Sequence, residues 1–385
     1  MKFLLFGVII TWEGLLLQQA IFFCARRMFN GRSTMREFHI DLSLSPEKRW
    51  KGMDNAGMAK VGRELIKHTL ADAASCGGLI GDSSSRFARM AGTALLTLLK
   101  TAVYVKYKAS GSPYEGDIKA WATMLNLPFK DVLFANLIYE VSQMADRLYP
   151  MGCTSVAAWV NGRMVHVRNM DWPLKGIGPG TVKITYYGRH GPFTTVGWPG
   201  YVGVLSGVAE NRFSATINQL PQTGKLHLDG MPSHFVLRKV FDTMATYDSA
   251  IDVLKNYNLV AATIFMVVGV KKGEAAVVEY DGTTVVTRRI RGAGPLTAAN
   301  HAEGTDSELH KDDESVMDSM YREERMDAAM KKVLKSGNKG PTILLKVADS
   351  AKWELTAQQM ALVPSTGEAS VRIHNTNKAV SRLLG

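Results

Sequence analysis

The dipeptide Asn161-Gly162 is the feature that most restricts how this chain can fold. It separates two short runs, 154–160 and 163–169, in which apolar and β-branched residues are frequent. Asn-Gly is favoured in two-residue hairpin turns because both central residues of such a turn need a positive φ. The sequence therefore predicts two antiparallel strands joined by a tight turn.

The register of this hairpin brings reactive side chains to its open end. Met170 should face Cys153, which makes Arg168 a diagonal neighbour on the same face, about 7 Å away and within reach of its long side chain. Strand alternation directs Asp171 to the other face, but Pro173 predicts that the strand ends, so we expect Asp171 to turn inward. A thiol, a guanidinium and a carboxylate together form a candidate nucleophile site. The alternative is a structural ion pair beside an inert cysteine.

The hydrophobic pattern changes from helical to strand-like at Cys153. Before it, we expect helices over 49–71, over 90–106 and, as one or two helices, over 118–148. Strands are predicted over 181–187, 194–197, 202–208 and 213–218, continuing the sheet of the hairpin, and over 262–270, 274–280, 284–288 and 295–300, with helices over 232–245, 249–257 and 314–334. This order is typical of an α+β chain with two sheets and helices outside them.

The amino-terminal residues contain two apolar runs, 3–10 and 15–24, around Glu13. The first run has the length of the apolar part of a signal sequence, but no small-residue cleavage site follows it. In a membrane span, Glu13 would cost about 2.5 kcal/mol or more. The alternatives are a signal or anchor sequence, an apolar helix on the body of the protein, or a start at Met28 or Met35. The compartment stays open: secreted, acidic or membrane-associated if the segment is a signal, and otherwise cytoplasmic.

The net charge of +11 comes from 46 basic and 35 acidic side chains that are spread thinly along the chain. A nucleic-acid-binding surface needs clustered Lys and Arg, so we expect no nucleic-acid partner. Contact with an anionic membrane surface is easier to reconcile with this charge. The apolar helix over 90–105, with its basic end, belongs either to the core or a subunit interface, or contacts lipid beside a pocket.

The cysteines Cys24, Cys76 and Cys153 are too few and too scattered for a disulfide framework or a four-ligand zinc site. Four further potential ligands share a polar stretch without metal-site spacing, and we expect them in a solvated loop: His301, His310, Asp312 and Asp313. The sequence therefore predicts neither a metal nor another cofactor.

Several segments, taken in order, resemble one known family. They are 40–50, 126–140, Cys153-Thr154-Ser155, His166-Val167-Arg168-Asn169-Met170-Asp171, 200–203, 216–218 and Ala299-Asn300. Together they resemble the acid ceramidase and N-acylethanolamine-hydrolysing acid amidase family, part of the choloylglycine hydrolase group of N-terminal nucleophile hydrolases. The resemblance extends from about residue 38 to about residue 350 and is most specific around Cys153.

This resemblance implies a four-layer αββα core preceded by a mainly helical segment. We therefore divide the chain into a signal, anchor or apolar leader (1–35), a helical alpha-subunit segment (36–152) and a catalytic beta subunit (153–385). It also implies a zymogen that cuts itself between Gly152 and Cys153, with fragments that stay associated. Cys153 would then be both nucleophile and amino terminus, and its α-amine is a base that could take the thiol proton near neutral pH.

The resemblance also implies roles for single residues. Asp171 would hold the new amino group, and Arg168 would orient the nucleophile and the substrate carbonyl. Asn218 and Asn300 would help to form the oxyanion site. Arg325 is the closest match to a later family arginine, with a solvated helix charge as the alternative. The implied reaction converts the linear amide of an N-acyl lipid, of the ceramide or N-acylethanolamine type, to fatty acid and amine without a cofactor.

Other functions remain open on the same fold. They are a bile-salt or penicillin-type acylase, an acyltransferase whose thioester is taken by an amine, and a non-catalytic, membrane-associated homologue. Gln219 stands where the two enzymes of the family have an acidic residue, so the charge around the cleavage site differs. Cys76 has no obvious partner, so no disulfide between the subunits is predicted.

Overall fold

The computed structural model describes residues 35–75, 86–144, 152–172, 174, 176–222, 226–227, 229–303, 314–336 and 341–374. The chain forms two units, Met1–Arg36 and Glu37–Gly385, and every described helix and strand belongs to the second. The interpretations of 1–27, Cys24, Cys76, His310, Asp312 and Asp313 lie outside the described residues.

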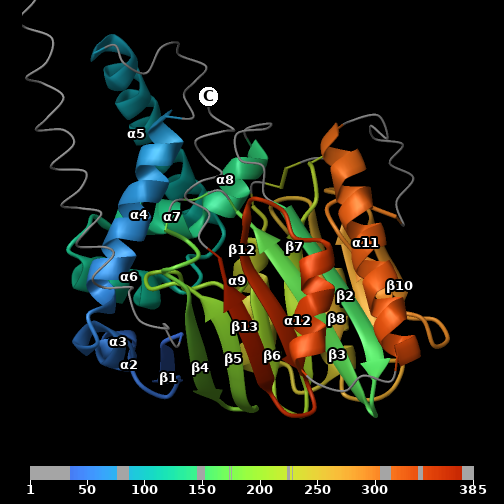
Figure 1. The fold of residues 1–385 in the computed structure, drawn as a ribbon. Coiled ribbons are helices and arrows are strands. Elements are labelled where there is room, and N and C mark those ends of the chain that lie inside the picture. The colour runs from blue at the N-terminus through green and yellow to red at the C-terminus, as the bar shows by residue number, and fades with distance from the viewer. Residues whose placement is uncertain are drawn as a thin grey trace, which may run out of the picture. The chain divides into compact units, whose positions relative to one another are not determined.

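The described strands form an eight-stranded and a five-stranded sheet (Figure 1). In hydrogen-bonded order, the larger contains β1 (Glu37–Asp41), β4 (Val182–Gly188), β5 (Gly191–Gly197), β6 (Ser206–Ala209), β7 (Phe213–Gln219), β8 (Thr263–Val268), β9 (Ala275–Tyr280) and β10 (Val285–Arg289). The smaller contains β11 (Leu296–Ala298), β2 (Gly152–Val160), β3 (Arg163–Asp171), β12 (Thr356–Val363) and β13 (Glu368–Ile373). β1 pairs with β4 in parallel, so the segment before the hairpin also supplies an edge strand.

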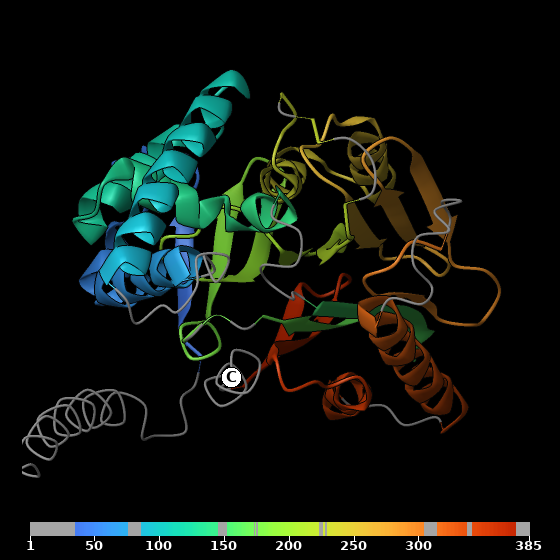
Figure 2. The ribbon, with the colours of Figure 1, turned by 90° about the horizontal axis from the view of Figure 1, so that it is seen from above.

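Apolar side chains pack the two sheets face to face. Ala157 of the smaller sheet shares a buried cluster with Ile264 and Met266 of the larger. The outer face of the larger sheet is covered by α9 (Ser233–Thr243) and α10 (Tyr247–Asn256), and that of the smaller sheet by α11 (Glu314–Ser336) and α12 (Pro341–Ser350). Figure 2 shows α11 and α12 on the side of the smaller sheet that faces away from the larger. The predicted α+β chain with an αββα core is confirmed.

The segment before the hairpin contains more helices than its pattern predicts. They are α2 (Pro46–Arg49), α3 (Lys51–Asn55), α4 (Met58–Ser75), α5 (Arg86–Ala109), α6 (Glu115–Leu125), α7 (Phe129–Asn136) and α8 (Ile138–Met144). The single helix expected over 49–71 is wrong, because Gly57 adopts a φ of +74° between α3 and α4. Asn126 ends α6 with a φ of +48° and Pro128 follows, so three helices replace the one or two expected over 118–148.

The strands predicted over 181–187, 194–197, 202–208 and 213–218 belong to the larger sheet and do not continue that of the hairpin, whereas the strand predicted over 295–300 forms β11 beside it. The hairpin instead lies between β11 and β12. No element was predicted over 341–374, which forms α12, β12 and β13. β12 is buried along its whole length and pairs with β3, so it completes the sheet that carries the candidate nucleophile.

The helix α5 exposes part of its apolar surface. Leu96 and Val103 are buried, whereas Met90 and Leu98 are 63 % and 69 % exposed. No helix in the described ranges combines the length and the hydropathy of a membrane span. A core or interface role and lipid contact both remain predictions for this helix.

Candidate active site

β2 and β3 form a hairpin in the predicted register. Asn161 and Gly162 occupy the turn with φ of +52° and +81°, and Cys153 pairs with Met170. Arg168 lies diagonally across this pair, and its Nη2 donates a hydrogen bond to Cys153 Sγ at 3.1 Å. The thiol and the guanidinium therefore meet as the register predicts.

The guanidinium of Arg168 is buried and held by acceptors of the larger sheet. Only 1 % of the residue is exposed. Its Nη2 also donates to the Ile217 carbonyl at 2.6 Å, and its Nη1 donates to the Leu205 carbonyl and to Ser206 Oγ. A cation fixed in this way stabilises the negative charge that develops on a sulfur nucleophile.

Asn300 holds the backbone of the cysteine. Its Oδ1 accepts a hydrogen bond from the Cys153 amide N–H at 2.7 Å, and its Nδ2 donates to the Gln219 carbonyl at 2.7 Å. The backbone N–H of Asn300 donates to Ser319 Oγ, also at 2.7 Å. The amide nitrogen of the Gly152–Cys153 bond is therefore already bound by a predicted site residue.

Arg322, on α11, is a residue of this site that the sequence analysis missed. Its Nη1 donates to the Cys153 carbonyl at 3.0 Å and to Thr154 Oγ1 at 2.7 Å. Its Nη2 donates to Asn300 Oδ1 at 3.0 Å. A second buried guanidinium thus contacts the carbonyl of Cys153 and the side chain that holds its amide.

Arg325, the site arginine predicted on this helix, does not reach Cys153. It is exposed, and its Nη1 donates to the Tyr321 hydroxyl at 3.1 Å. Arg322 instead shares the buried side of α11 with Met326, which packs against the smaller sheet. Met326, Met330 and Val333 repeat on this side at spacings of four and three residues, and continuing that apolar pattern backward along the helix reaches Arg322 and not Arg325.

Asp171 does not turn inward, so that prediction is wrong. Its neighbour Trp172 donates its N–H to the Leu355 carbonyl at 2.9 Å, which keeps the chain extended past the end of β3. Asp171 pairs with Gly152 and follows strand alternation, which places it on the face opposite Arg168. It therefore approaches the Gly152–Cys153 bond from the α11 side of the sheet.

The carboxyl group of Asp171 is buried against Gly152. Its Oδ1 accepts a hydrogen bond from Thr356 Oγ1 at 2.5 Å, and its Oδ2 lies 3.7 Å from Arg322 Nη1. A methyl group added to Gly152 would lie 3.0 Å from Oδ2, which shows how closely the two residues approach. Burial raises the pKa of Asp171 to about 6, although Arg322 and Thr356 act in the opposite direction. The group can therefore exchange a proton in mildly acidic solution.

Asn218 joins the two sheets near the site. Its Nδ2 donates to the carbonyls of Ala298 and Ala299 at 3.0 and 3.1 Å, and its Oδ1 accepts from Ser155 Oγ at 3.1 Å. Its side-chain N–H groups are thus bound to the backbone that leads into Asn300. In this conformation Asn218 positions Asn300 and does not point at the thiol.

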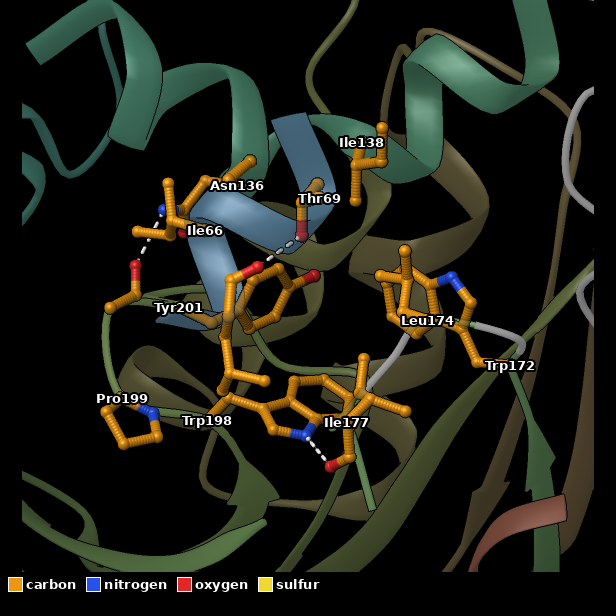
Figure 3. Close-up of a pocket in the computed structure, with 13 residues that line it drawn as sticks. Ile66, Thr69, Asn136, Ile138, Trp172, Leu174, Ile177, Trp198, Pro199 and Tyr201 are labelled. Atoms are coloured by element: carbon orange, nitrogen blue, oxygen red, sulfur yellow. Dashed lines mark hydrogen bonds between the residues drawn. The ribbon is translucent and has the colours of Figure 1, made fainter. Parts of the chain in front are cut away.

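An apolar cavity of about 40 Å³ opens next to the end of β3 (Figure 3). Its lining includes Leu65, Ile138, Trp172, Leu174 and Trp198, and Figure 3 shows the Tyr201 hydroxyl directed among them. A cavity of this size holds a few water molecules. An acyl chain would need these side chains to move apart.

A buried polar cluster lies where α8 meets α9. Glu140 Oε1 accepts a hydrogen bond from the Ser233 N–H at 3.1 Å and lies 3.2 Å from His234 Nδ1. Within the described residues, Glu140 Oε2, His234 Nε2 and the Tyr201 hydroxyl are buried without a hydrogen-bond partner. Because Tyr201 also lines the cavity, its hydroxyl offers a partner for a polar ligand group or water.

Comparison with known proteins gives a family and several relatives. A sequence model of the family described as acyl-coenzyme A:6-aminopenicillanic acid acyl-transferase matches residues 160–362. The N-acylethanolamine-hydrolyzing acid amidase of Caenorhabditis elegans is 27% identical over 183 residues, which are 42% of this chain and 49% of that protein. The acid ceramidase of Homo sapiens is 23% identical over 278 residues, which are 65% of this chain and 64% of that protein. The chain thus spans 49% and 64% of the lengths of these two relatives.

Solved structures give a partial likeness. The Caenorhabditis elegans N-acylethanolamine-hydrolyzing acid amidase ortholog has a TM-score of 0.47 at 20% identity, covering 58% of this chain and 100% of that chain. A conjugated bile acid hydrolase from Clostridium perfringens has a TM-score of 0.39 at 12% identity, covering 58% of this chain and 94% of that chain.

Proposed function

The chain belongs to the acyl-coenzyme A:6-aminopenicillanic acid acyl-transferase family, and from this we propose that it cleaves itself before Cys153 and then hydrolyses the amide bond of N-acyl lipids. The observation that carries the proposal is the environment of Cys153. Arg168 Nη2 lies 3.1 Å from its sulfur and Asn300 Oδ1 lies 2.7 Å from its amide nitrogen. The acid amidases and acid ceramidases among the relatives support an amide as the bond that is cut.

In the proposed self-cleavage, Cys153 Sγ attacks the carbonyl carbon of Gly152. The bond from that carbon to the Cys153 nitrogen breaks, the nitrogen takes up a proton, and a thioester forms. Water then hydrolyses the thioester, which leaves a carboxyl group on Gly152 and a free thiol and amine on Cys153. The absence of a side chain on Gly152 favours the attack, and Asp171, with a pKa of about 6, is close enough to exchange a proton.

In the proposed turnover, the amine of Cys153 takes the proton of its own thiol. The thiolate attacks the substrate carbonyl, Arg168 stabilises the charge on sulfur, and the amine product leaves with the proton. Asn300 holds the amine of Cys153 through Oδ1, and its Nδ2, which donates to the Gln219 carbonyl in this structure, is the candidate donor to the oxyanion. Water, deprotonated by the same amine, then releases the fatty acid. Asn218 supports this step by holding the backbone that leads into Asn300.

The apolar lining of the cavity supports an acyl chain as part of the substrate. The unpartnered Tyr201 hydroxyl in this lining favours a substrate that also carries a polar group. Contact of the exposed side of α5 with a membrane surface would bring such a lipid to the protein. The name of the family favours one second candidate, an acyltransferase in which an amine takes the acyl group from the thioester.

Intact mass under denaturing conditions tests self-cleavage. Wild type, Cys153→Ala and the control Cys76→Ala would be incubated between about pH 4.5 and about pH 8. We expect wild type and Cys76→Ala to give fragments that end at Gly152 and begin at Cys153, and Cys153→Ala to stay whole. A wild type that remains whole at every pH would refute the proposal.

The reaction type needs a second assay. The cleaved protein would be given an N-acylethanolamine or a ceramide, with and without an added primary amine. Release of free fatty acid that the added amine does not reduce identifies a hydrolase. Appearance of the new amide at the expense of the acid identifies the transferase.

A further inference from the structure

Three potential metal ligands lie together beside Asn300. They are His301 and Glu303, which follow β11, and Glu323 on α11, and their ligand atoms are all within 4.8 Å of one another. The geometry points to a binding site for a divalent metal cation, of which zinc matches the ligand set best. The prediction of a solvated loop at His301 is wrong, because only 14% of this side chain is exposed.

The ligands are arranged around a buried carboxylate. His301 Nε2 lies 3.0 Å from Glu323 Oε2, and only 7% of Glu323 is exposed. The other oxygen of Glu323, Oε1, is buried and has no hydrogen-bond partner among the described residues. An unsatisfied buried carboxylate oxygen is costly, and a cation would satisfy it.

The ring of His301 is oriented as a ligand would be. Its Nδ1 lies 2.8 Å from Ser319 Oγ, so Nε2 faces the carboxylates. Metal-binding histidines almost always use their second nitrogen in this way, because the outer hydrogen bond fixes the ring and its tautomer. One imidazole and two carboxylates, completed by water, suit zinc, whereas calcium and magnesium prefer a shell of oxygen atoms.

The surroundings carry an excess of negative charge. Besides Glu303 and Glu323, the carboxylate of Glu279 lies in the same network, because Arg288 donates to it at 2.8 Å and to Glu303 at 3.2 Å. Glu279 and Glu303 therefore share the charge of Arg288, and Glu323 lies beside Glu303, so a divalent cation would neutralise the remaining negative charge.

The metal would act on the candidate active site through one serine. Ser319 Oγ lies between His301 Nδ1 and the backbone N–H of Asn300, at 2.8 and 2.7 Å. Asn300 in turn binds the amide of Cys153. An occupied site would therefore restrain Asn300, while metal binding itself does not depend on self-cleavage or on hydrolysis.

The test uses the full chain with Cys153→Ala, which removes the reactive thiol, after treatment with a chelator. Titration with Zn²⁺ by calorimetry and with Co²⁺ by visible absorption should show one site per chain. Glu323→Gln, which keeps the shape of the side chain, and His301→Gln should each weaken binding by at least about tenfold. His190→Ala, in the turn between β4 and β5, is the matched control and should bind as the parent does.

A thermal melt separates lost ligands from lost structure. Without metal, the Glu323→Gln variant should melt cooperatively, and added Zn²⁺ should raise the melting temperature of the parent but not of the variant. No binding by the parent, or equal binding by the parent and both variants, would overturn the proposal.

Discussion

Arg168 combines two tasks in one buried guanidinium, because it contacts the thiol and also three acceptors of the larger sheet. A lysine keeps the charge but cannot donate in so many directions. Arg168→Lys should therefore slow self-cleavage by about 100-fold and lower the free energy of unfolding by about 2 kcal/mol or more, since buried acceptors lose their donors. Fragment mass against time and denaturant unfolding measure the two effects. Arg163→Lys, at the other end of β3, is the control, and equal behaviour of both variants would contradict this account.

The two arginines of α11 give a matched pair. Arg322→Gln removes the donor to the Cys153 carbonyl and the cation nearest Asp171, so self-cleavage should slow at least tenfold. Arg325→Gln changes an exposed side chain, so the rate of self-cleavage should stay the same. The free energy of unfolding should change by less than about 0.5 kcal/mol. The fragment-mass time course compares them, and a slower Arg325→Gln variant would return that residue to the site.

Asp171 should make the free energy of unfolding depend on pH, and the sign of this dependence follows from the burial of its carboxyl group. Its pKa is raised from 3.8 to about 6, so the folded state holds the proton more tightly than the unfolded state. The ionised group therefore destabilises the fold above pH 6, and this penalty falls as the pH drops from 6 toward 3.8. Relative to Asp171→Asn, the parent should gain about 1 kcal/mol between about pH 7 and about pH 5. Denaturant unfolding in the Cys153→Ala background measures this, and parallel profiles would show that the pKa is not raised.

At the scale of residues, the sequence predicts the contacts that follow from pairing between two neighbouring strands. The Asn-Gly turn fixes the register, and the register fixes the meeting of Cys153 with Arg168. Arg322 and Glu323 were missed because their partners lie far away in the chain, on β2 and after β11. Which arginine of a helix faces a sheet depends on packing that local charge does not reveal.

At the scale of elements, two glycines differ in backbone conformation, and replacing each with alanine should change the stability of the fold in opposite directions. Gly162 has a φ of +81° in the hairpin turn, so Gly162→Ala should destabilise the fold by about 1 kcal/mol. Gly52 lies in the helix α3 with nothing within 4 Å of an added methyl group, so Gly52→Ala should stabilise by about 0.5–1 kcal/mol. Urea unfolding of both variants measures the difference. A harmless Gly162→Ala would mean that the turn does not set the register.

The elements that escaped prediction share one physical cause. β12 contains Gln358 and Gln359, which break the apolar pattern of a central strand, yet both are fully buried. Their side-chain N–H groups donate to distant side chains, since Gln358 Nε2 donates to Thr181 Oγ1 at 2.7 Å and Gln359 Nε2 to Asn169 Oδ1 at 3.3 Å. Burial of a polar residue depends on partners that only the folded chain supplies. In the apolar strands and amphipathic helices, by contrast, the spacing of the apolar residues already indicates which face is buried.

At the scale of the molecule, the segments on either side of Cys153 are interlocked. β1 adds five residues in parallel to β4, and Asn136 of α7 binds the loop after β5, through the Gly200 carbonyl and the Val202 N–H, both at 2.8 Å. The two fragments should therefore co-elute in size exclusion without denaturant and separate only after unfolding. An early fragment that elutes alone would show that the shared sheet is too weak to retain it.

The pairing of Gly152 with Asp171 has a consequence for the direction of self-cleavage. Gly152 covers a carboxyl group whose pKa is raised by burial, and after cleavage its strand pairing with Asp171 would have to keep it there. If the new carboxy terminus moves away, water reaches Asp171 and its proton is lost just as Cys153 gains an ammonium group. The resulting attraction between opposite charges would hold the product state and make rejoining unfavourable. Cleaved protein kept at mildly acidic pH should then never regain the mass of the intact chain.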